Sequence, residues 1–447
     1  MNARILRNVR VINEGQEIAA DVLIRHDRID RIDEGFSVAF RAEEYDAEGA
    51  WLFPGVIDDQ VHFREPGLTH KARIYTESRA AAAGGVTSYM EMPNTKPPTT
   101  DAKALKEKWD IAGRNSLVNY SFYIGGANDN LADVLDIDPQ TVPGLKLFLG
   151  ASTGNMLVDD QQALDSFFRE WPGLIAVHSE DEPTIQAQLK EARAHYGAQI
   201  PVREHPNIRS VEACVKMTQR VIALAQRYRT RLHVLHISTA EEAEIFEHLS
   251  EAERQHITAE ACVHHLWFSS QDYVRWGNKI KCNPAIKEPR HREALRKALG
   301  AGVFAVVATD HAPHTEEEKE QTDYTKAPAG LPLVQYSLSM MLEMADEEGW
   351  SKPQIAEWMA HAPARLFGVK ERGFIREGYH ADLVLVRPLT EWVNKQRLYY
   401  RCGWSPLEGH TFPYRVEGTW VNGIPVYGSE GVMDQDVSQR LRFGASH

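Results

Sequence analysis

An apolar run that ends in polar side chains indicates the fold: residues 51–65 read WLFPGVIDDQVHFRE, and 51–57 have the length of a strand. Further apolar runs of strand length follow along the chain, at residues 87–92, 118–124, 145–149, 174–177, 232–236, 257–263 and 303–308. Helical patterns stand between several of these runs, at residues 72–83, 159–170, 211–228 and 290–299. Buried strands that alternate with helices are typical of a parallel barrel. The sequence therefore predicts an α/β fold, a (β/α)8 TIM-like barrel.

Both ends of the chain have a different pattern, with short alternating segments separated by turn residues. Residues 20–24 and 28–32 are examples near the N-terminus, and residues 381–386 and 416–423 repeat the pattern near the C-terminus. Such segments are typical of short antiparallel strands. We expect one small β-sandwich domain formed from both termini. Its N-terminal part is residues 1–52, the metal-dependent barrel is residues 53–372, and its C-terminal part is residues 373–447.

The composition is that of an ordinary globular protein. Of 447 residues, 43% are hydrophobic and 25% are charged, which excludes a mostly disordered, collagen-like or coiled-coil chain. The net charge of −13 has the wrong sign for a general nucleic-acid binder. No apolar run approaches the roughly 20 residues that span a bilayer. We expect a small-molecule substrate, and neither nucleic acid nor membrane as a partner.

Cysteine use and the first residues bear on location. The four cysteines form no C-x-x-C pair, which argues against a disulfide framework or a cysteine-based zinc site. The opening MNARILRN carries charges where a signal peptide has its apolar region. We therefore expect a cytoplasmic protein.

Metal-binding side chains occur at the ends of several predicted strands. His62 follows the first strand, His178 and His236 end the fifth and sixth, and Asp310 follows the eighth. In a barrel these positions meet at one mouth. Imidazoles and a carboxylate are ligands of catalytic Zn²⁺. A lone histidine of this kind is more often structural, but three of them with an aspartate predict a metal site.

Lys146 interrupts an apolar strand, where an unpaired ammonium is costly. It pairs with a barrel carboxylate or extends out of the barrel end in one interpretation. In the other, burial lowers its pKa, and the neutral amine adds CO₂ to give a carbamate that bridges two cations. The spacing alone leaves both open. Beyond the last strand, the polar residues 315–329 predict a mobile loop over the barrel mouth.

Four motifs together resemble the dihydroorotase branch of the amidohydrolase superfamily: FPGVID at 53–58, HFREPG at 62–67, MPNT at 92–95 and TDHAPH at 309–314. The resemblance covers nearly the whole chain, including the β domain. It implies a zinc-dependent hydrolase that reversibly opens the ring amide of dihydroorotate to carbamoyl aspartate in pyrimidine biosynthesis. By position it implies His62, His178, His236 and Asp310 as ligands, and Lys146 as a carboxylated bridge. It also implies that Asp310 is the catalytic base and acid, and that the protein forms a homodimer.

The resemblance also implies a substrate-binding set. Arg64 offers a planar fork that matches the carboxylate of dihydroorotate, whereas related allantoinases usually carry another residue there and hydantoinases lack the Arg-Glu-Pro-Gly continuation. The alternative for Arg64 is an ordinary salt bridge, and Asn283 before a proline is also a common turn residue. The implied substrate-binding residues are Arg64, Asn94, Asn283, His314, Gly330 and Leu331.

The sequence departs from the family at the end of the first strand. The family's strand ends in His-x-His, but here the first position is Gln60, whose neutral amide is a weak zinc ligand. One or two zinc ions per chain are therefore expected, with a mononuclear enzyme or a labile second metal as the alternatives. Two other functions stay open: a hydantoinase-like or allantoinase-like amidohydrolase, and an inert dihydroorotase-like partner of a carbamoyltransferase.

Overall fold

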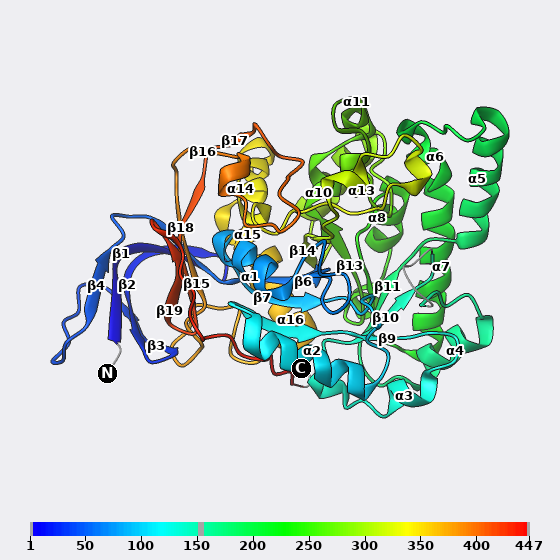
Figure 1. Cartoon of the computed structure of the whole chain (residues 1–447). Coiled ribbons are helices and arrows are strands. Elements are labelled where there is room, and N and C mark those ends of the chain that lie inside the picture. Colours follow the sequence, from blue (N-terminus) through cyan, green and yellow to red (C-terminus); the bar gives the residue numbers. More distant parts are fainter. Residues whose placement is uncertain (1–2, 151–155, 445–447) are drawn as a thin grey trace.

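Strands from both termini lie side by side in one sheet at one end of the molecule (Figure 1). The computed structural model describes residues 3–150 and 156–444. The sheet runs in the order β20-β19-β18-β15-β5-β1-β2-β3, with β4 beside β1. Its strands are β1 (Ala3–Asn13), β2 (Gln16–Arg25), β3 (Arg28–Asp33), β4 (Glu43–Asp46), β5 (Trp51–Pro54), β15 (Leu383–Arg387), β18 (Arg415–Val421), β19 (Ile424–Gly428) and β20 (Gly431–Val432).

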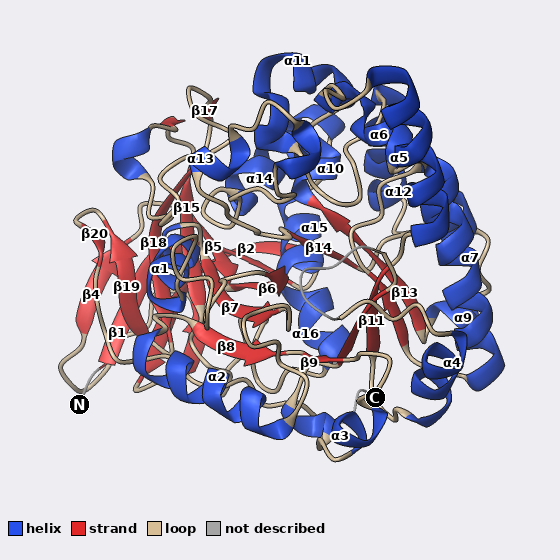
Figure 2. Ribbon diagram, turned by 45° about the vertical axis from the view of Figure 1, so that its right-hand side comes forward, coloured by secondary structure: helices blue, strands red, loops and turns tan. Residues whose placement is uncertain are grey.

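The middle of the chain forms a parallel barrel that helices surround (Figure 2). Its strands are β6 (Val56–Val61), β7 (Val86–Glu91), β8 (Asn119–Phe122) with its short continuation β9 (Ile124–Gly125), β10 (Leu145–Phe148), β11 (Ile175–His178), β12 (Leu232–Val234), β13 (Ile257–Cys262) and β14 (Val306–Ala308). A parallel bridge between Val61 and His311 closes the barrel, where His62 N donates to His311 O at 2.7 Å. The predicted fold, a TIM-like barrel with a sheet domain from both termini, is confirmed.

The helices lie where the sequence pattern predicts them, and shorter ones fill the longer connections. The predicted helix 211–228 is α7 (Val211–Tyr228), which begins after Ser210, whose side chain accepts from Ala213 N. The others are α1 (Ile74–Ala83), α2 (Ala102–Asn115), α3 (Leu131–Leu135), α4 (Gln161–Glu170), α5 (Glu182–Tyr196), α6 (His205–Ile208), α8 (Ala240–Glu247), α9 (Glu251–Arg254), α10 (Val263–Trp267), α11 (Tyr273–Trp276), α12 (Pro289–Gly300), α13 (Glu316–Lys319), α14 (Ser337–Glu348), α15 (Lys352–Ala356) and α16 (Ala362–Phe367). A two-stranded pair, β16 (Glu391–Trp392) and β17 (Thr411–Phe412), follows them. None of the helices described is long and apolar enough to cross a membrane.

The run 51–57, expected as one strand, is divided between the two sheets. β5 pairs with β15 in the small domain, and β6 begins the barrel one residue later. Gly55 lies at the crossing, where a Cβ atom would come within 2.0 Å of Thr87 Oγ1. Only glycine therefore lets the two sheets approach this closely.

A buried polar cluster joins the small sheet to the barrel. Asp382 accepts from Asn119 Nδ2 of β8 at 3.1 Å and from Asn422 N at 2.8 Å, and it forms an ion pair with Arg372. All four side chains are buried. A buried carboxylate needs such partners, so this cluster holds the two parts in register.

Candidate metal and substrate site

A cavity of about 270 Å³ opens at the C-terminal ends of the barrel strands. It brings together residues that lie up to 270 positions apart in the sequence, as barrel closure requires. The predicted residues that line it are His62, Arg64, Asn94, His178, His236, Asn283, Asp310, His314 and Gly330. The other two predicted residues, Lys146 and Leu331, are not part of the cavity lining, and each is only 1% exposed. Gln60, Phe148, Ala312, Pro328 and Ala329 complete the lining.

His178 and His236 turn ring nitrogens toward each other, with His178 Nδ1 3.0 Å from His236 Nε2. The other nitrogen of His178 lies 2.8 Å from Glu180 Oε2. Burial raises the pKa of Glu180, but Arg209 and His178 outweigh burial and lower the pKa to about 2. Glu180 is therefore a carboxylate that accepts the Nε2 proton, which leaves the Nδ1 lone pair of His178 facing His236. A carboxylate behind a histidine commonly orients metal ligands in this way.

His62 and Asp310 form the second half of the arrangement. Asn94 Oδ1 lies 2.8 Å from His62 Nδ1, so this nitrogen carries the proton. His62 Nε2 then faces Asp310 Oδ1 at 3.0 Å. A proton can occupy the place of a cation between Nε2 and Asp310: the hydrogen bond and charge of a protonated His62 then outweigh burial, which by itself raises the pKa of Asp310, and the net pKa is lowered. The lone pair of His62 Nε2 and the carboxylate of Asp310 point toward the same place, an arrangement that suits a bound cation.

Gln60 presents its amide nitrogen to this half of the site. Its Nε2 donates to Asp310 Oδ1 at 3.2 Å, and its Oε1 lies 3.7 Å from Cys262 Sγ. The carbonyl oxygen, the only atom of the side chain suited to a metal, therefore points toward Cys262. In this orientation Gln60 supports Asp310 and adds no ligand.

Lys146 is fully buried on β10 and its Nζ has no hydrogen-bond partner in the described structure. Its Nζ lies 4.4 Å from the ring centre of Phe148. Burial lowers the pKa of the amine to about 7, although the charges of Asp310 and Glu260 oppose this. Pairing with a carboxylate, one part of the first interpretation of this residue, is absent among the described ion pairs, and the carbamate stays a prediction.

These donor atoms fit a divalent cation. Nε2 of His62 faces a carboxylate with no proton donor between them, two imidazole nitrogens face each other, and among the described residues the buried amine of Lys146 has no hydrogen-bond partner. Nitrogen and carboxylate oxygen are the ligands that zinc takes in hydrolases. Arg64, His236 and Asp310 also have positive φ angles of 68°, 41° and 45°. Strained backbone of this kind clusters at functional sites.

Arg64 lines the cavity wall next to Pro313 and His314. Its Nε donates to Pro313 O at 3.2 Å, and its Nη2 lies 3.0 Å from His314 Nε2. Burial lowers its pKa to about 10, so it remains a cation at neutral pH. In the described part of the chain no carboxylate lies within 4.0 Å of its guanidinium. The ordinary salt bridge considered for Arg64 is therefore not formed.

The remaining predicted substrate-binding residues differ in whether their polar groups already have hydrogen-bond partners within the protein. Asn283 lines the cavity, and its buried Oδ1 has no hydrogen-bond partner among residues 3–150 and 156–444. The backbone of Gly330 is already used: its N–H donates to Lys281 O at 2.8 Å, and its carbonyl accepts from Lys319 Nζ at 3.0 Å. The carbonyl of Leu331 accepts from Ala312 N at 2.8 Å. A ring contact from these two residues stays a prediction.

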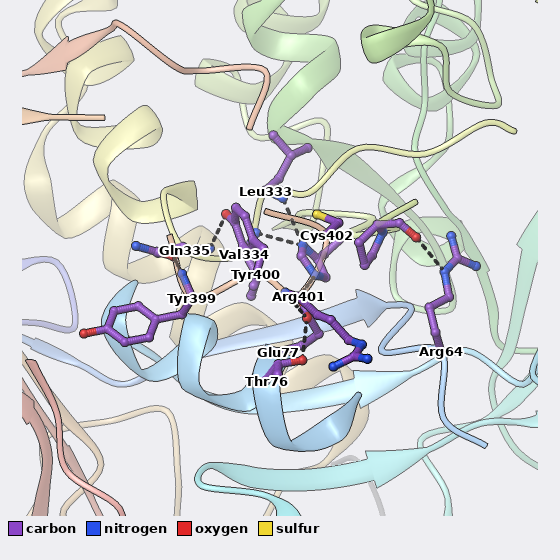
Figure 3. A network of polar contacts seen from close by, with 12 residues as sticks. Arg64, Thr76, Glu77, Leu333, Val334, Gln335, Tyr399, Tyr400, Arg401 and Cys402 are labelled. Atoms are coloured by element: carbon purple, nitrogen blue, oxygen red, sulfur yellow. Dashed lines mark hydrogen bonds and ion pairs between the residues drawn. The ribbon is translucent and has the colours of Figure 1, made fainter. Parts of the chain in front are cut away.

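A hydrogen-bonded network connects the segment after β14 to helix α1 and to the chain around residue 401, and Figure 3 shows the part around Glu77 and Arg401. His311 Nδ1 accepts from Leu333 N at 2.9 Å, so its Nε2 carries the proton and donates to Glu77 Oε2 at 2.8 Å. The other oxygen of Glu77 accepts from Arg401 N at 3.1 Å. Glu77 of helix α1 therefore links the segment that follows β14 to the backbone at residue 401.

The segment 315–329 lies at the cavity but is not the loose loop expected. It contains the short helix α13, and the buried Lys319 donates from Nζ to three carbonyls, those of Lys281, Pro328 and Gly330. Three donors matched to three acceptors satisfy a buried ammonium. Pro328 and Ala329 are thereby fixed in the cavity wall.

Sequence reasoning missed three residues of the site. Glu180 stands two positions after His178, a spacing that could have suggested its orienting role. Phe148 shields Lys146, and Lys71 Nζ donates to His314 Nδ1 at 2.9 Å. No local pattern distinguishes Lys71 from an ordinary surface lysine, because only the tertiary fold brings it to His314.

Comparisons with known proteins agree with this geometry. A model of the amidohydrolase family matches residues 51–426. The chain belongs to this family. This amidohydrolase is 31% identical over 433 residues to an allantoinase of Bacillus velezensis, and the aligned region covers 96% of this chain and 94% of that relative. It is 33% identical over 432 residues to a dihydroorotase of Halobacterium salinarum, and the aligned region covers 95% of this chain and 98% of that relative.

Solved structures give the same architecture. An L-hydantoinase from Arthrobacter aurescens superposes with a TM-score of 0.94 at 28% identity and covers 99% of this chain and 100% of that chain. Relatives named for three different cyclic substrates thus match with similar identity. The substrate of this amidohydrolase must be inferred from its own cavity.

Proposed function

We propose that this amidohydrolase is a dihydroorotase, which reversibly hydrolyses the ring amide of L-dihydroorotate to N-carbamoyl-L-aspartate in pyrimidine biosynthesis. The observation that supports this substrate is the buried guanidinium of Arg64 in the cavity wall, which no described carboxylate neutralises within 4.0 Å. A buried cation without a counter-ion is costly, so it favours an anionic ligand. Dihydroorotate carries a carboxylate on its ring, whereas hydantoin and allantoin carry none.

Asp310 is placed to move the proton. As water adds to the ring carbonyl carbon, the carboxylate of Asp310 accepts the proton that the water releases. The ring C–N bond then breaks, and Asp310 returns the proton to the leaving nitrogen. Its lowered pKa keeps it ionised and ready as a base at neutral pH. Arg64 holds the substrate carboxylate meanwhile, with Asn94, Asn283 and His314 beside it.

The proposed ligands for one or two Zn²⁺ ions are His62, His178, His236, Asp310 and Lys146 as a carbamate. The carbamate forms when the neutral Nζ adds to CO₂ and loses a proton. A bound divalent cation lowers the pKa of a water and polarises the carbonyl under attack.

A second candidate is hydrolysis of a hydantoin or of allantoin, which the names of the relatives favour. An inert partner of a carbamoyltransferase is the third. The joint presence of Asp310, the histidine pair and Arg64 around one cavity argues against an inert role, because a purely structural subunit has no need of both metal and substrate groups.

The proposal is tested by measuring how fast the purified protein hydrolyses L-dihydroorotate, hydantoin and allantoin. The zinc content is determined in the same sample. We expect dihydroorotate to be preferred, and Arg64→Ala to raise its KM by about 10- to 100-fold, as loss of a charged hydrogen bond implies. Hydantoin turnover would change little, because hydantoin has no carboxylate. Arg64→Lys is the matched control, which keeps the charge but loses the fork. Equal dihydroorotate activity in wild type and Arg64→Ala would contradict the proposed substrate.

A further inference from the structure

Three ionisable side chains meet inside the barrel at a place that the reaction does not use. Asp59 lies on β6, His233 on β12 and Glu260 on β13, and each is 0% exposed. None of the three lines the cavity. Asp59 and Glu260 stand 201 positions apart, so the cluster exists only because the barrel closes.

The distances in this cluster are too long for hydrogen bonds and suit ligands around a cation. His233 Nε2 lies 3.6 Å from Asp59 Oδ2 and 3.8 Å from Glu260 Oε2, beyond the usual range for a nitrogen–oxygen hydrogen bond. One ligand atom from each of the three residues lies within 4.8 Å of the others. Two atoms bound about 2.1 Å from one zinc ion, in tetrahedral or trigonal geometry, lie about 3.4–3.7 Å apart.

The carboxylate oxygens that face His233 have no other partner in the described structure. Both oxygens of Asp59 and Oε2 of Glu260 accept no hydrogen bond. The other oxygen of Glu260, in contrast, accepts from His236 N at 2.9 Å and lies 3.1 Å from Cys262 Sγ. Buried carboxylate oxygens without partners are rare and costly, and here they converge on one point.

The hydrogen bond behind His233 fixes its tautomer. Thr258 Oγ1 donates to Leu232 O at 3.3 Å, so the 2.8 Å contact with His233 Nδ1 has the ring nitrogen as donor. Nε2 then points its lone pair between the two carboxylates. A histidine that binds a metal through one nitrogen commonly donates its other N–H to an oxygen.

We propose that Asp59, His233 and Glu260 bind a divalent cation, Zn²⁺ or Mn²⁺, as a structural site inside the barrel and separate from the catalytic cavity. Asp59 binds through both oxygens, which gives four donor atoms with Nε2 of His233 and Oε2 of Glu260. Two carboxylates and a divalent cation sum to zero charge, which suits a buried location. The cation ties β6 to β12 and β13 across the barrel interior, and it binds as the barrel forms.

A proton is the competitor at this position. Burial lowers the pKa of His233, but the facing carboxylates of Asp59 and Glu260 outweigh it and raise the pKa to about 9. In that alternative the cluster is an imidazolium between two carboxylates and binds no metal. The test must therefore count cations at this cluster directly, whatever the state of the catalytic site.

The experiment measures metal content after the full-length protein is unfolded, refolded with zinc and manganese, and dialysed natively against a chelator. We expect the open cavity to lose its metal while one cation per chain remains, because the cluster has no exposed atom. Asp59→Asn and His233→Gln should each lose that remaining cation. Asp58→Asn is the matched control: Asp58 is also buried but bonds to Thr309 Oγ1 at 2.6 Å, so this variant should keep the cation.

Two outcomes would overturn the proposal. One is refolded wild type that keeps no cation after dialysis. The other is a remaining cation that persists in either Asp59→Asn or His233→Gln. If Asp59→Asn does not fold, two other measurements test the proposal: the metal content of His233→Gln, and the absorption spectrum of Co²⁺ bound to the wild type. The spectrum of Co²⁺ with four nitrogen and oxygen ligands differs from that of hexaaqua Co²⁺. Absence of four-coordinate Co²⁺ bands from the wild type after dialysis against the chelator counts against the site.

Discussion

The side-chain amide of Gln60 donates to Oδ1 of Asp310 at 3.2 Å, at the position where the family's first strand carries a histidine. A group that donates a hydrogen bond to a ligand cannot also bind the metal through the same nitrogen. In the proposed site, glutamine at this position would thus replace a metal ligand by a side chain that supports Asp310. The half of the site beside Gln60 keeps His62 and Asp310, and the other half keeps His178 and His236.

Replacing Gln60 by histidine should restore the missing ligand. We expect Gln60→His to raise the zinc content of the purified protein by up to one ion per chain, measured by elemental analysis, because imidazole binds zinc far better than an amide. Gln60→Ala serves as the control, which loses the hydrogen bond to Asp310 without gaining a ligand. An unchanged metal count in Gln60→His would mean that other ligands already complete this half.

Asp310→Asn should remove the proton carrier and leave the fold intact. General acid–base catalysis contributes about 10²–10⁴ in rate, so we expect kcat for dihydroorotate to fall by at least that factor. The side chain keeps its size, and circular dichroism and the melting temperature should show the native fold. Near-normal kcat in a correctly folded, metal-loaded variant would remove Asp310 from the proton-transfer role.

Lys146→Ala should lose bound metal if the lysine carries a carbamate. A short carboxylic acid such as acetate or propionate fits the space that the side chain leaves and supplies an equivalent anion. We expect metal content and turnover to recover partly as this acid is added. Unaltered metal content in Lys146→Ala without any added acid would end the carbamate interpretation.

Glu391, far from the cavity, should make stability depend on pH. Burial raises its pKa to about 7, although Arg397 and Arg415 oppose this. The folded state therefore binds this proton more tightly than the unfolded state, so the contribution is present below the ordinary pKa and is lost as pH rises through 7. Glu391→Gln should flatten this part of the profile, and its melting temperature relative to wild type should be higher at pH 8 than at pH 5. Parallel profiles for the two proteins would refute the assignment.

The chain pattern alone determined the barrel, the two-ended sheet domain and the kinds of side chain at the strand ends. These features depend on local periodicity and on the rule that strand ends of a barrel converge, so they require no knowledge of which side chains touch. The predicted helix 211–228 agrees with α7 residue for residue for this reason. His62, His178, His236 and Asp310 were placed correctly around one cavity on the same basis.

Only the tertiary structure decided the orientation of each side chain and the hydrogen-bond partners that fix it. Gln60 could have faced a metal or Asp310, and the 3.2 Å hydrogen bond selects Asp310. Lys319 looked like part of a loose polar loop, but its ammonium meets three carbonyls supplied by residues 281, 328 and 330. The cluster of Asp59, His233 and Glu260 has no sequence signature at all. Its members come from strands far apart in the chain, and barrel closure alone brings their ligand atoms within 4.8 Å of one another.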